Sequence, residues 1–407
     1  MRIDISRLMT RLDELAKIGS IPGNGVCRLA FSKEDKAGRD YIAHLMHNLG
    51  LHVSIDKVGN ILGVRSGRKT GPMVLSGSHT DTVATGGRFD GSLGVLAALE
   101  VIEQLNEEGI ETAQPIGIIS FVNEEGVRFM PDMMGSLFLR GDLSVEEVRQ
   151  IEGVDGTTIG ENLDSLTYAG NADFSTLDIG QFVELHIEQG PLLETEGLDI
   201  GVVERVQGIC WLEFTFEGTA NHAGTTPMSM RHDAGFVAGA LTGEVRKIVS
   251  EIGGEQRATV GSIRLLPNLI NVIAKQAIVT VDLRNPDGDQ LDLAEQAVLA
   301  AADRIAADEG VQVSHRKLAD VAPVSFDSSC VDAVSRAAES LGYKNRRMIS
   351  GAGHDAQILA GKYPAAMIFV PSRNGISHNV AEYTTPEHIE AGANVLLHTI
   401  LDLAGGE

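Results

Sequence analysis

The sequence predicts an α/β protein in which a smaller α+β domain is inserted into a larger domain with a mainly parallel central sheet. Three observations support this prediction. The chain has 407 residues, more than one ordinary domain contains. Its first part alternates apolar strands with amphipathic helices, which is typical of a buried parallel sheet. The pattern changes near residue 207 and returns near residue 323.

The larger domain is expected to contain helices whose apolar residues recur with helical periodicity. They span residues 3–16, 33–50, 91–109, 145–151, 328–342 and 385–404. Its expected strands are short apolar runs bounded by turn residues. They lie within residues 52–67, 72–79, 115–126, 181–190 and 365–371. Apart from one helix, residues 126–177 have no clear periodicity.

The inserted segment has a different order of elements. The expected elements, in chain order, are strand 209–218, helix 233–253, strands 258–266 and 276–285, helix 291–310 and strand 311–319. This order, with one helix after the first strand and one after the third, is that of a small split-βαβ sandwich. The predicted domain segments are 1–207, 208–322 and 323–407, of which the first and third form one domain.

The composition favours a soluble, cytoplasmic protein whose acidic clusters could bind cations. The formal net charge of -23 disfavours nucleic acid and anionic membranes as partners. The three cysteines are scattered, so a disulfide framework is not expected. The first residues lack the apolar core of a signal peptide, and no apolar run is long enough to span a bilayer.

Side chains that bind metals or transfer protons gather where the expected strands of the larger domain end. They are His79 and Asp81, Asn123–Glu125, His186 and Glu188, and His378. In open α/β sheets the ligand crevice lies beyond the carboxyl ends of the strands. If these strands share a sheet, the side chains converge on one site. Mixed imidazole and carboxylate ligands suit Zn²⁺, Mn²⁺ or Co²⁺ better than Ca²⁺.

Several of these residues have an ordinary structural alternative. Asp90 can be the N-cap of the following helix, or a carboxylate shared by metal ions. Glu124 and Glu125 can be solvated loop acids, but they follow an apolar run, so one can bind a metal while the other transfers protons. Asp81 lies two residues after His79, and in an extended chain its carboxylate can orient the imidazole.

Other catalytic motifs do not fit the sequence. The string GSLGVLAALE resembles a phosphate-binding loop only loosely, because it lacks both Gly-x-Gly-x-x-Gly and Gly-Lys-Ser/Thr. The sequence contains neither a Gly-x-Ser-x-Gly elbow nor a His-Glu-x-x-His helix. The strand-end cluster therefore remains the candidate site.

Six motifs give essentially the whole chain a resemblance to the M20 metallohydrolases. They are GSHTDTVATGGRFDGSLGVL, FVNEEGVRF, ELHIEQGPLLE, GTANHAGTTPMSMRHDA, SGAGHDA and IFVPSRNGISHNVAEYT. The string HIEQGP, with His186 where general M20 peptidases usually have an acidic ligand, points to the amidase branch. That branch contains N-carbamoyl-L-amino-acid hydrolases, bacterial β-ureidopropionases and allantoate amidohydrolases.

The resemblance implies an aminopeptidase-like catalytic domain that binds two divalent metal ions, Zn²⁺ or alternatively Mn²⁺, Co²⁺ or Ni²⁺. The implied ligands are His79 and His186 for one ion, Glu125 and His378 for the other, and Asp90 between them. Glu124 would be the general base and acid, and Asp81 would orient His79. The inserted domain would serve as a lid and as the surface through which a homodimer forms.

The resemblance also implies residues that bind the substrate. His222 of the inserted domain would help to bind the scissile group in the neighbouring subunit. Arg284 would bind a substrate carboxylate, since its planar guanidinium can do so through two hydrogen bonds. Arg284 can also be an ordinary surface charge at a strand end, and His222 an ordinary turn residue. The remaining implied substrate ligands are Gln189, Asn271 and His354.

The expected function is therefore hydrolysis of the ureido C–N bond of an N-carbamoyl-L-amino acid, a small ureido carboxylate, to the amino acid, ammonia and CO2. Allantoate is the alternative substrate, followed by N-carbamoyl-β-alanine. A dipeptidase or aminoacylase of the wider family is disfavoured by His186. A non-catalytic binding protein would be expected to lack Glu124 or one of the metal ligands.

Overall fold

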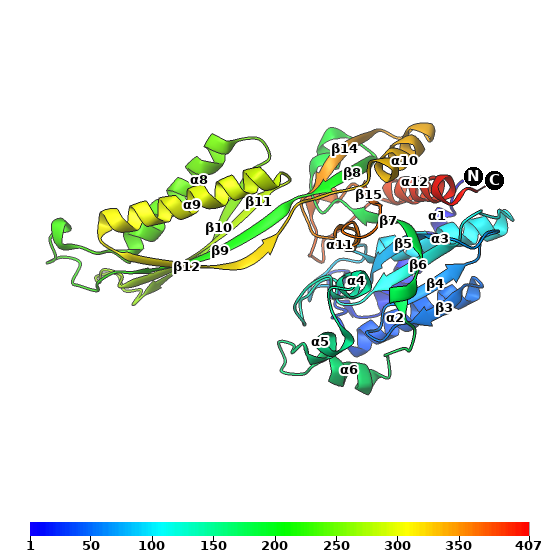
Figure 1. Ribbon diagram of the computed structural model, residues 1–407, viewed down its shortest axis with the longest axis horizontal. Coiled ribbons are helices and arrows are strands. Elements are labelled where there is room, and N and C mark those ends of the chain that lie inside the picture. The colour runs from blue at the N-terminus through cyan, green and yellow to red at the C-terminus, as the bar shows by residue number, and fades with distance from the viewer. Residues whose placement is uncertain (407) are drawn as a thin grey trace. The chain divides into compact units, whose positions relative to one another are not determined.

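The computed structural model describes residues 1–406, which separate into two compact units (Figure 1). Unit 1 is formed by Met1–Glu204 together with the chain from Ser325 onward, and unit 2 by Arg205–Val324. Unit 1 is mixed α/β, and unit 2 has a separate antiparallel sheet. The predicted fold class is confirmed. The assignment of a catalytic role to one unit and a lid role to the other remains a prediction.

The sheet of unit 1 has a parallel centre with antiparallel edges. Its strand order is β13-β8-β15-β7-β5-β6-β4-β3, and β14 pairs with β8. The strands are β3 (His52–Ile55), β4 (Ile61–Arg65), β5 (Met73–His79), β6 (Ile116–Phe121), β7 (Ile179–Ile187), β8 (Ile200–Val206), β13 (Val324–Ser325), β14 (Asn345–Ser350) and β15 (Ala365–Val370). β15, β7, β5 and β6 run parallel, so their carboxyl ends meet at one edge of the sheet.

The helices of unit 1 pack against this sheet and against one another. They are α1 (Ile5–Lys17), α2 (Lys33–Asn48), α3 (Ser92–Glu107), α4 (Met134–Arg140), α5 (Val145–Gln150), α6 (Ile159–Leu166), α7 (Leu192–Glu196), α10 (Ser328–Ser340), α11 (Asp355–Leu359) and α12 (Pro386–Ala404). α3 packs directly on β5 and β7. A Cβ atom at Gly94 would lie 2.5 Å from the carbonyl oxygen of Leu185, so only glycine permits this approach.

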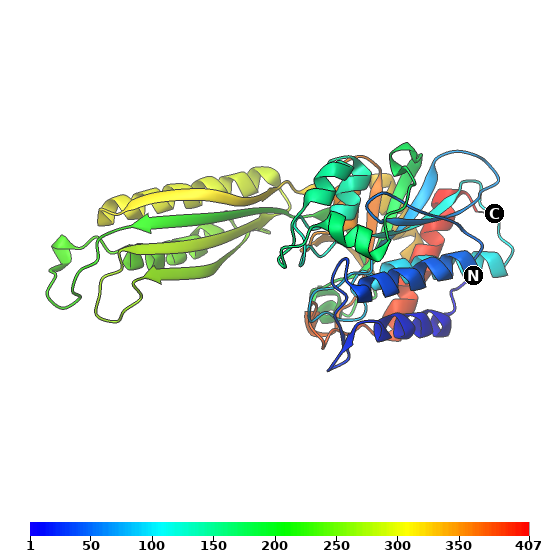
Figure 2. The ribbon, with the colours of Figure 1, turned by 90° about the horizontal axis from the view of Figure 1, so that it is seen from below.

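The two ends of the chain lie side by side in unit 1, as both ribbon views show (Figure 2). His398 of α12 contacts the carbonyl oxygen of Met1 through Nε2 at 3.1 Å. A short hairpin, β1 (Ser20–Ile21) with β2 (Gly25–Val26), follows α1. α12 begins at Pro386 with Thr385 as its N-cap, within the helix expected over residues 385–404.

The segment that gave no clear pattern contains two further helices, α4 and α6. α6 begins with a capping box in which Thr158 and Glu161 bond to each other's backbone N–H groups, and the Thr-x-x-Glu signal for it was present in the sequence. α4 has no such signal, because it starts after Met133, whose φ is 51° and which makes no side-chain cap. Strands β8 and β14 were also missed.

Unit 2 is a four-stranded antiparallel sheet covered by two helices. The strand order is β10-β11-β9-β12. The elements are β9 (Gly208–Glu217), α8 (Ala234–Ile252), β10 (Arg257–Leu266), β11 (Gln276–Asn285), α9 (Gly288–Glu309) and β12 (Gln312–Val321). Both helices lie on one face of the sheet in both views. Alternate residues of β11 are buried beneath them, so this unit has its own core.

No helix within residues 1–406 combines the length and apolar character that crossing a bilayer requires.

Candidate metal centre

The carboxyl ends of the parallel strands bring the predicted metal ligands of unit 1 together. β5 ends at His79, and β7 ends one residue after His186. Glu124 and Glu125 follow β6, and His378 lies in the loop that follows β15. The close placement results from the shared sheet edge, which the sequence had suggested.

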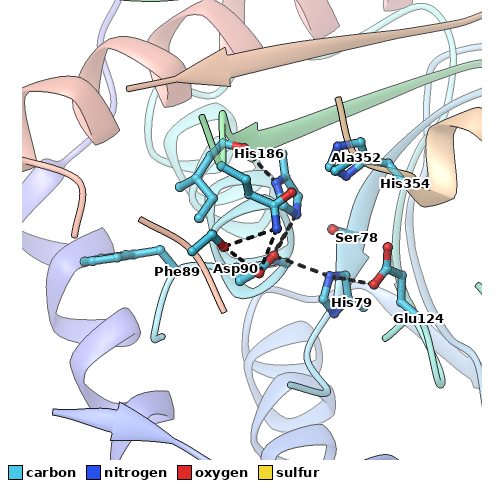
Figure 3. Close-up of polar contacts among 12 residues, drawn as sticks. Ser78, His79, Phe89, Asp90, Glu124, His186, Ala352 and His354 are labelled. Carbon is cyan, nitrogen blue, oxygen red and sulfur yellow. Dashed lines mark hydrogen bonds and ion pairs between the residues drawn. The ribbon is translucent and has the colours of Figure 1, made fainter. Parts of the chain in front are cut away.

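Asp90 lies at the middle of this cluster. Its Oδ1 atom is 3.1 Å from Nε2 of His186 and 3.9 Å from Nε2 of His79. Its Oδ2 atom is 3.3 Å from Nε2 of His378. Figure 3 shows Asp90 between the His186 and His79 rings. Each carboxylate oxygen thus faces a different set of imidazoles, an arrangement that suits a bridging ligand.

The alternative role of Asp90 as a helix cap is not observed. The N-cap of α3 is Gly91, and the side chain of Asp90 makes no capping hydrogen bond. Gly91 has a φ of 59°, and a Cβ atom there would lie 2.3 Å from Nε2 of His79. The backbone therefore passes close to the imidazole, which leaves the Asp90 carboxylate facing the histidines.

The ligand atoms fall into overlapping groups that are compact enough to hold a cation. One group is His79, Asp90 and His186, and another is Asp90, Glu125 and His378. Within each group the ligand atoms lie within 4.8 Å of one another. In the second group, Nε2 of His378 is 3.4 Å from Oε2 of Glu125. A third group, Glu184, His186 and His354, shares His186 with the first.

Backbone carbonyls set the orientation of the two buried histidines. Nδ1 of His79 is 2.9 Å from the carbonyl oxygen of Asp81, and Nδ1 of His186 is 2.9 Å from that of Ile187. A carbonyl only accepts hydrogen bonds, so each Nδ1 carries a proton and each Nε2 faces Asp90. The backbone N–H of Gly91 also lies 3.2 Å from Nε2 of His186.

Asp81 orients His79 differently from the expected way. Its carboxylate lies 3.7 Å from Nδ1 of His79, too far for a hydrogen bond, and the main-chain carbonyl makes the contact instead. β5 ends at His79, so the alternation of an extended chain does not continue to Asp81. The carboxylate accepts hydrogen bonds from the backbone N–H groups of Glu124 and Glu125, both at 3.2 Å. Asp81 therefore also fixes the two glutamates.

Glu124 lies beside the metal ligands, with Oε2 at 3.4 Å from Nε2 of His79 (Figure 3). Burial raises its pKa well above the usual value, and the nearby charge of Asp355 raises it further. A glutamate in this setting holds a proton more readily than an exposed one does. This property suits a group that must accept a proton and later return it.

The charges of the cluster fit divalent cations. Burial, followed by the charge of Asp90, raises the pKa of Glu125 well above its usual value. Burial lowers the pKa of His79 to about 4, so this imidazole is neutral near pH 7. For Asp90 burial acts in the opposite direction, but hydrogen bonds with His186 and His378 hold its pKa well below the usual value. Several carboxylates are thus buried close together, and bound cations would neutralise them.

A cavity of about 150 Å³ opens onto the cluster. Its lining includes seven of the predicted site residues: Asp90, Glu124, Glu125, His186, Gln189, His354 and His378. The sequence had not indicated four others that also line it: Asp132, Met133, Ala352 and Gly353. Two of the predicted substrate ligands, Gln189 and His354, therefore lie at the metal ligands.

Gln189 and His354 are held in place by different contacts. Nε2 of Gln189 donates to Oδ2 of Asp90 at 3.0 Å. His354 is buried, its ring centroid lies 4.5 Å from that of His186, and its Nε2 is 3.1 Å from Oγ of Ser350. His354 is therefore fixed by packing and by its contact with Ser350, whereas the Gln189 amide donates to the candidate bridging carboxylate of Asp90.

The other three predicted substrate residues belong to unit 2. His222 and Asn271 lie on paired loops, since His222 is bridged to Val272 and the N–H of Ala223 donates to the carbonyl oxygen of Asn271 at 3.0 Å. Arg284 on β11 bonds to the carboxylate of Asp282 through Nε at 3.1 Å. The approach of these residues to the metal ligands remains a prediction.

Residues 75–402 match the model of peptidase family M20/M25/M40, and the chain belongs to this family. It is 39% identical to an N-carbamoyl-L-amino acid amidohydrolase of Geobacillus stearothermophilus, over 98% of this chain and 99% of the relative. It is 34% identical to the allantoate amidohydrolase of Bacillus subtilis, over 97% and 96% of the two chains.

Among solved structures, the chain is similar to an amidase of the hydantoinase/carbamoylase family from Burkholderia multivorans. The TM-score is 0.95 at 46% identity, over 99% of this chain and 98% of the other. The resemblance to the amidase branch of the M20 family is thereby confirmed.

Proposed function

We propose that this protein is a metal-dependent amidohydrolase that cleaves the ureido C–N bond of an N-carbamoyl-L-amino acid. Three of the relatives, at 39%, 38% and 35% identity, are N-carbamoyl-L-amino acid amidohydrolases. The observation that carries the proposal is the position of Asp90 between His79 and His186 on one side and His378 on the other, with Glu124 beside them.

The two compact ligand groups would hold two divalent cations. His79 and His186 would bind one, Glu125 and His378 the other, and Asp90 both. Zn²⁺ fits this set of nitrogen and oxygen donors, and Mn²⁺, Co²⁺ and Ni²⁺ are the alternatives. When bound, such cations polarise the scissile carbonyl and make water a stronger acid and a better nucleophile.

Glu124 would transfer the protons of the reaction. Its carboxylate removes a proton from water as the water oxygen bonds to the ureido carbon. Glu124 then gives that proton to the terminal nitrogen as the C–N bond breaks and ammonia leaves. The remaining carbamate loses CO2 to give the free amino acid. Burial raises the pKa of Glu124 well above its usual value, which helps this carboxylate to hold the proton until it is returned.

The substrate would be bound by residues from both units. Arg284 would bind the α-carboxylate through its guanidinium, in place of part of its contact with Asp282. His222 and Asn271 would contact the ureido group, and Gln189 and His354 would bind it from the metal side. This assignment gives a role to predicted site residues that are not assigned as metal ligands.

A cytoplasmic homodimer formed through unit 2 is part of the proposal. β10 and β12 are the edges of its sheet, and edge strands with free backbone groups favour pairing with a second chain. Phe236 of α8 and Ile263 and Leu266 of β10 are exposed apolar residues that a partner would cover. Unit 2 would also act as the lid.

Allantoate is the alternative substrate, and the 34% identity to the Bacillus subtilis allantoate amidohydrolase favours it as the second candidate. Allantoate is also a ureido carboxylate, so the same ligands and the same glutamate would serve. N-carbamoyl-β-alanine follows, because it places the carboxylate one carbon farther from the ureido group.

An ammonia-release assay of metal-loaded protein tests the proposal. The panel contains N-carbamoyl-L-amino acids with small, large and charged side chains, N-carbamoyl-β-alanine, allantoate and a dipeptide. We expect the largest kcat/KM for an N-carbamoyl-L-amino acid and a kcat at least about 100-fold lower with the Glu124→Gln variant. Faster turnover of allantoate would replace the leading substrate with the alternative. Preference for the dipeptide would contradict the amidohydrolase assignment.

A further inference from the structure

Glu382 is a buried glutamate that is not one of the proposed metal ligands and has no role in the proposed mechanism. It lies four residues after His378, and only 5% of it is exposed. Its Oε1 atom accepts hydrogen bonds from the backbone N–H groups of Phe89 at 3.0 Å and Asp90 at 3.2 Å. Its Oε2 atom accepts one from the hydroxyl of Ser377 at 3.1 Å. One carboxylate therefore joins the loop of Asp90 to the loop of His378.

The contact between these loops is closely fitted. A Cβ atom at Gly87 would lie 2.1 Å from Oε1 of Glu382 and 2.2 Å from its Cδ. The chain therefore has glycine at the point where the carboxylate passes the backbone, three residues before Asp90. Any larger residue at position 87 would have to displace the Glu382 side chain.

The same network continues to the metal-facing oxygen of Asp90. The hydroxyl of Ser377 lies 3.2 Å from Oδ2 of Asp90. The amide Nε2 of Gln189 lies 3.2 Å from that hydroxyl and 3.0 Å from Oδ2. Glu382 thus holds the backbone of Asp90 directly, and its contact with Ser377 places that hydroxyl beside the Asp90 carboxylate.

His378 depends on such support more than the other histidine ligands do. Its side chain is 51% exposed, whereas those of His79 and His186 are 1% exposed. Its backbone φ is 53°, a conformation that residues other than glycine adopt at an energetic cost. Packing does not fix this imidazole, so the loop that carries it must be anchored elsewhere.

We propose that Glu382 is a positioning residue that sets the distance between Asp90 and His378 and thereby the affinity for the cation these two residues share with Glu125. The inference rests on the proposed two-cation function. It assigns the role to the hydrogen bonds of Glu382, since its oxygens accept from two N–H groups and one hydroxyl. Partners that orient metal ligands in this way commonly change metal affinity 10- to 100-fold when they are removed.

Calorimetric titration of the metal-free protein with Zn²⁺ tests the proposal without reference to substrate. We expect wild type to bind two cations per chain. Glu382→Ala should bind one with unchanged affinity and the other at least 10-fold more weakly. Glu382→Gln keeps a carbonyl oxygen for the two N–H groups and an amide for Ser377, so its affinities should stay within about 3-fold of wild type. With both sites saturated, kcat of Glu382→Ala should fall while KM stays unchanged.

Two further variants separate positioning from a general loss of structure. Gly87→Ala keeps the glutamate but displaces it, and should weaken the same cation. Glu100→Ala removes another buried glutamate that joins distant segments, Asp4 and Arg7 to α3, and should leave both affinities unchanged. Gly87→Ala also gives the result if Glu382→Ala fails to fold.

The possible results lead to different conclusions. Two unchanged affinities in Glu382→Ala or Gly87→Ala would overturn the positioning role. Equal loss in Glu382→Gln and Glu382→Ala would also overturn it, because charge and not hydrogen bonding would then matter. Equal loss in Glu100→Ala would reduce the effect to general stability. Failure of wild type to bind two cations would refute the proposed function and, with it, the inference.

Discussion

Two regions of unit 1 bury carboxylates, and the negative charge of these carboxylates is offset differently in each region. Glu100 of α3 is fully buried and accepts hydrogen bonds from Arg7 and Arg11 of α1 at 2.8 to 3.1 Å. The metal centre buries Asp90, Glu124 and Glu125 as well, but these face imidazoles and not guanidinium groups. One group of acids is thus neutralised by the chain itself.

The kind of cationic partner distinguishes a cluster that stabilises the fold from a site that can carry out chemistry. An arginine is charged at every relevant pH and holds its partner through fixed hydrogen bonds, so the Glu100 cluster fastens α1 to α3. An imidazole can present a lone pair, and a carboxylate near other carboxylates gives up its proton reluctantly. The candidate metal centre would therefore take cations from solution, and its acids would stay available for chemistry.

The largest effect is expected from Glu124→Gln. The amide cannot accept a proton from water, so kcat should fall 10²- to 10⁴-fold, which corresponds to about 3–5 kcal/mol of transition-state stabilisation. Ammonia release gives the rate, and elemental analysis gives the metal content, which should remain that of wild type. Near-normal turnover with full metal content would show that another group transfers the proton.

Glu100→Ala should instead reduce stability. Removing this carboxylate takes away the fully buried partner of two arginines, which keep their more exposed pairs with Glu103 and Glu107 of α3. We expect the free energy of unfolding to fall by about 3 kcal/mol, the lower end for a broken buried ion pair because both arginines are partly exposed. Urea unfolding followed by circular dichroism measures it. Loss of bound metal in Glu100→Ala with an unchanged free energy of unfolding would contradict the structural role of Glu100.

The features that a sequence predicts best are those set by neighbours along the chain. The ends of β5, β6 and β7 deliver His79, Glu124 and His186 because an apolar run stops at the sheet edge, and this signal is local. The role of Glu382 was missed, because its partner Asp90 lies 292 residues away and nothing local to Glu382 marks the contact. The carbonyl of Asp81 was missed because every residue has one.

Metal removal should affect the two regions unequally. Without cations the carboxylates of the candidate metal centre repel one another, and restoring metal at 100 times its dissociation constant should stabilise the folded chain by about 2.7 kcal/mol for each cation bound. Thermal unfolding with and without Zn²⁺ measures this increment. Glu100→Ala should show the wild-type increment on a lower baseline. A smaller increment in Glu100→Ala would mean that the two regions are coupled.

The smallest effect is expected for an exposed carboxylate on the same helix that carries Arg7 and Arg11. Glu14 pairs with Lys17 at 2.5 Å, but both side chains are about half exposed or more, so water screens the charges. Glu14→Gln keeps the shape and removes the charge, and should change the free energy of unfolding by less than about 0.5 kcal/mol. Urea unfolding beside Glu100→Ala makes the comparison. A loss above about 1 kcal/mol would show that charge on α1 matters wherever it lies, and burial would then not explain the effect of Glu100.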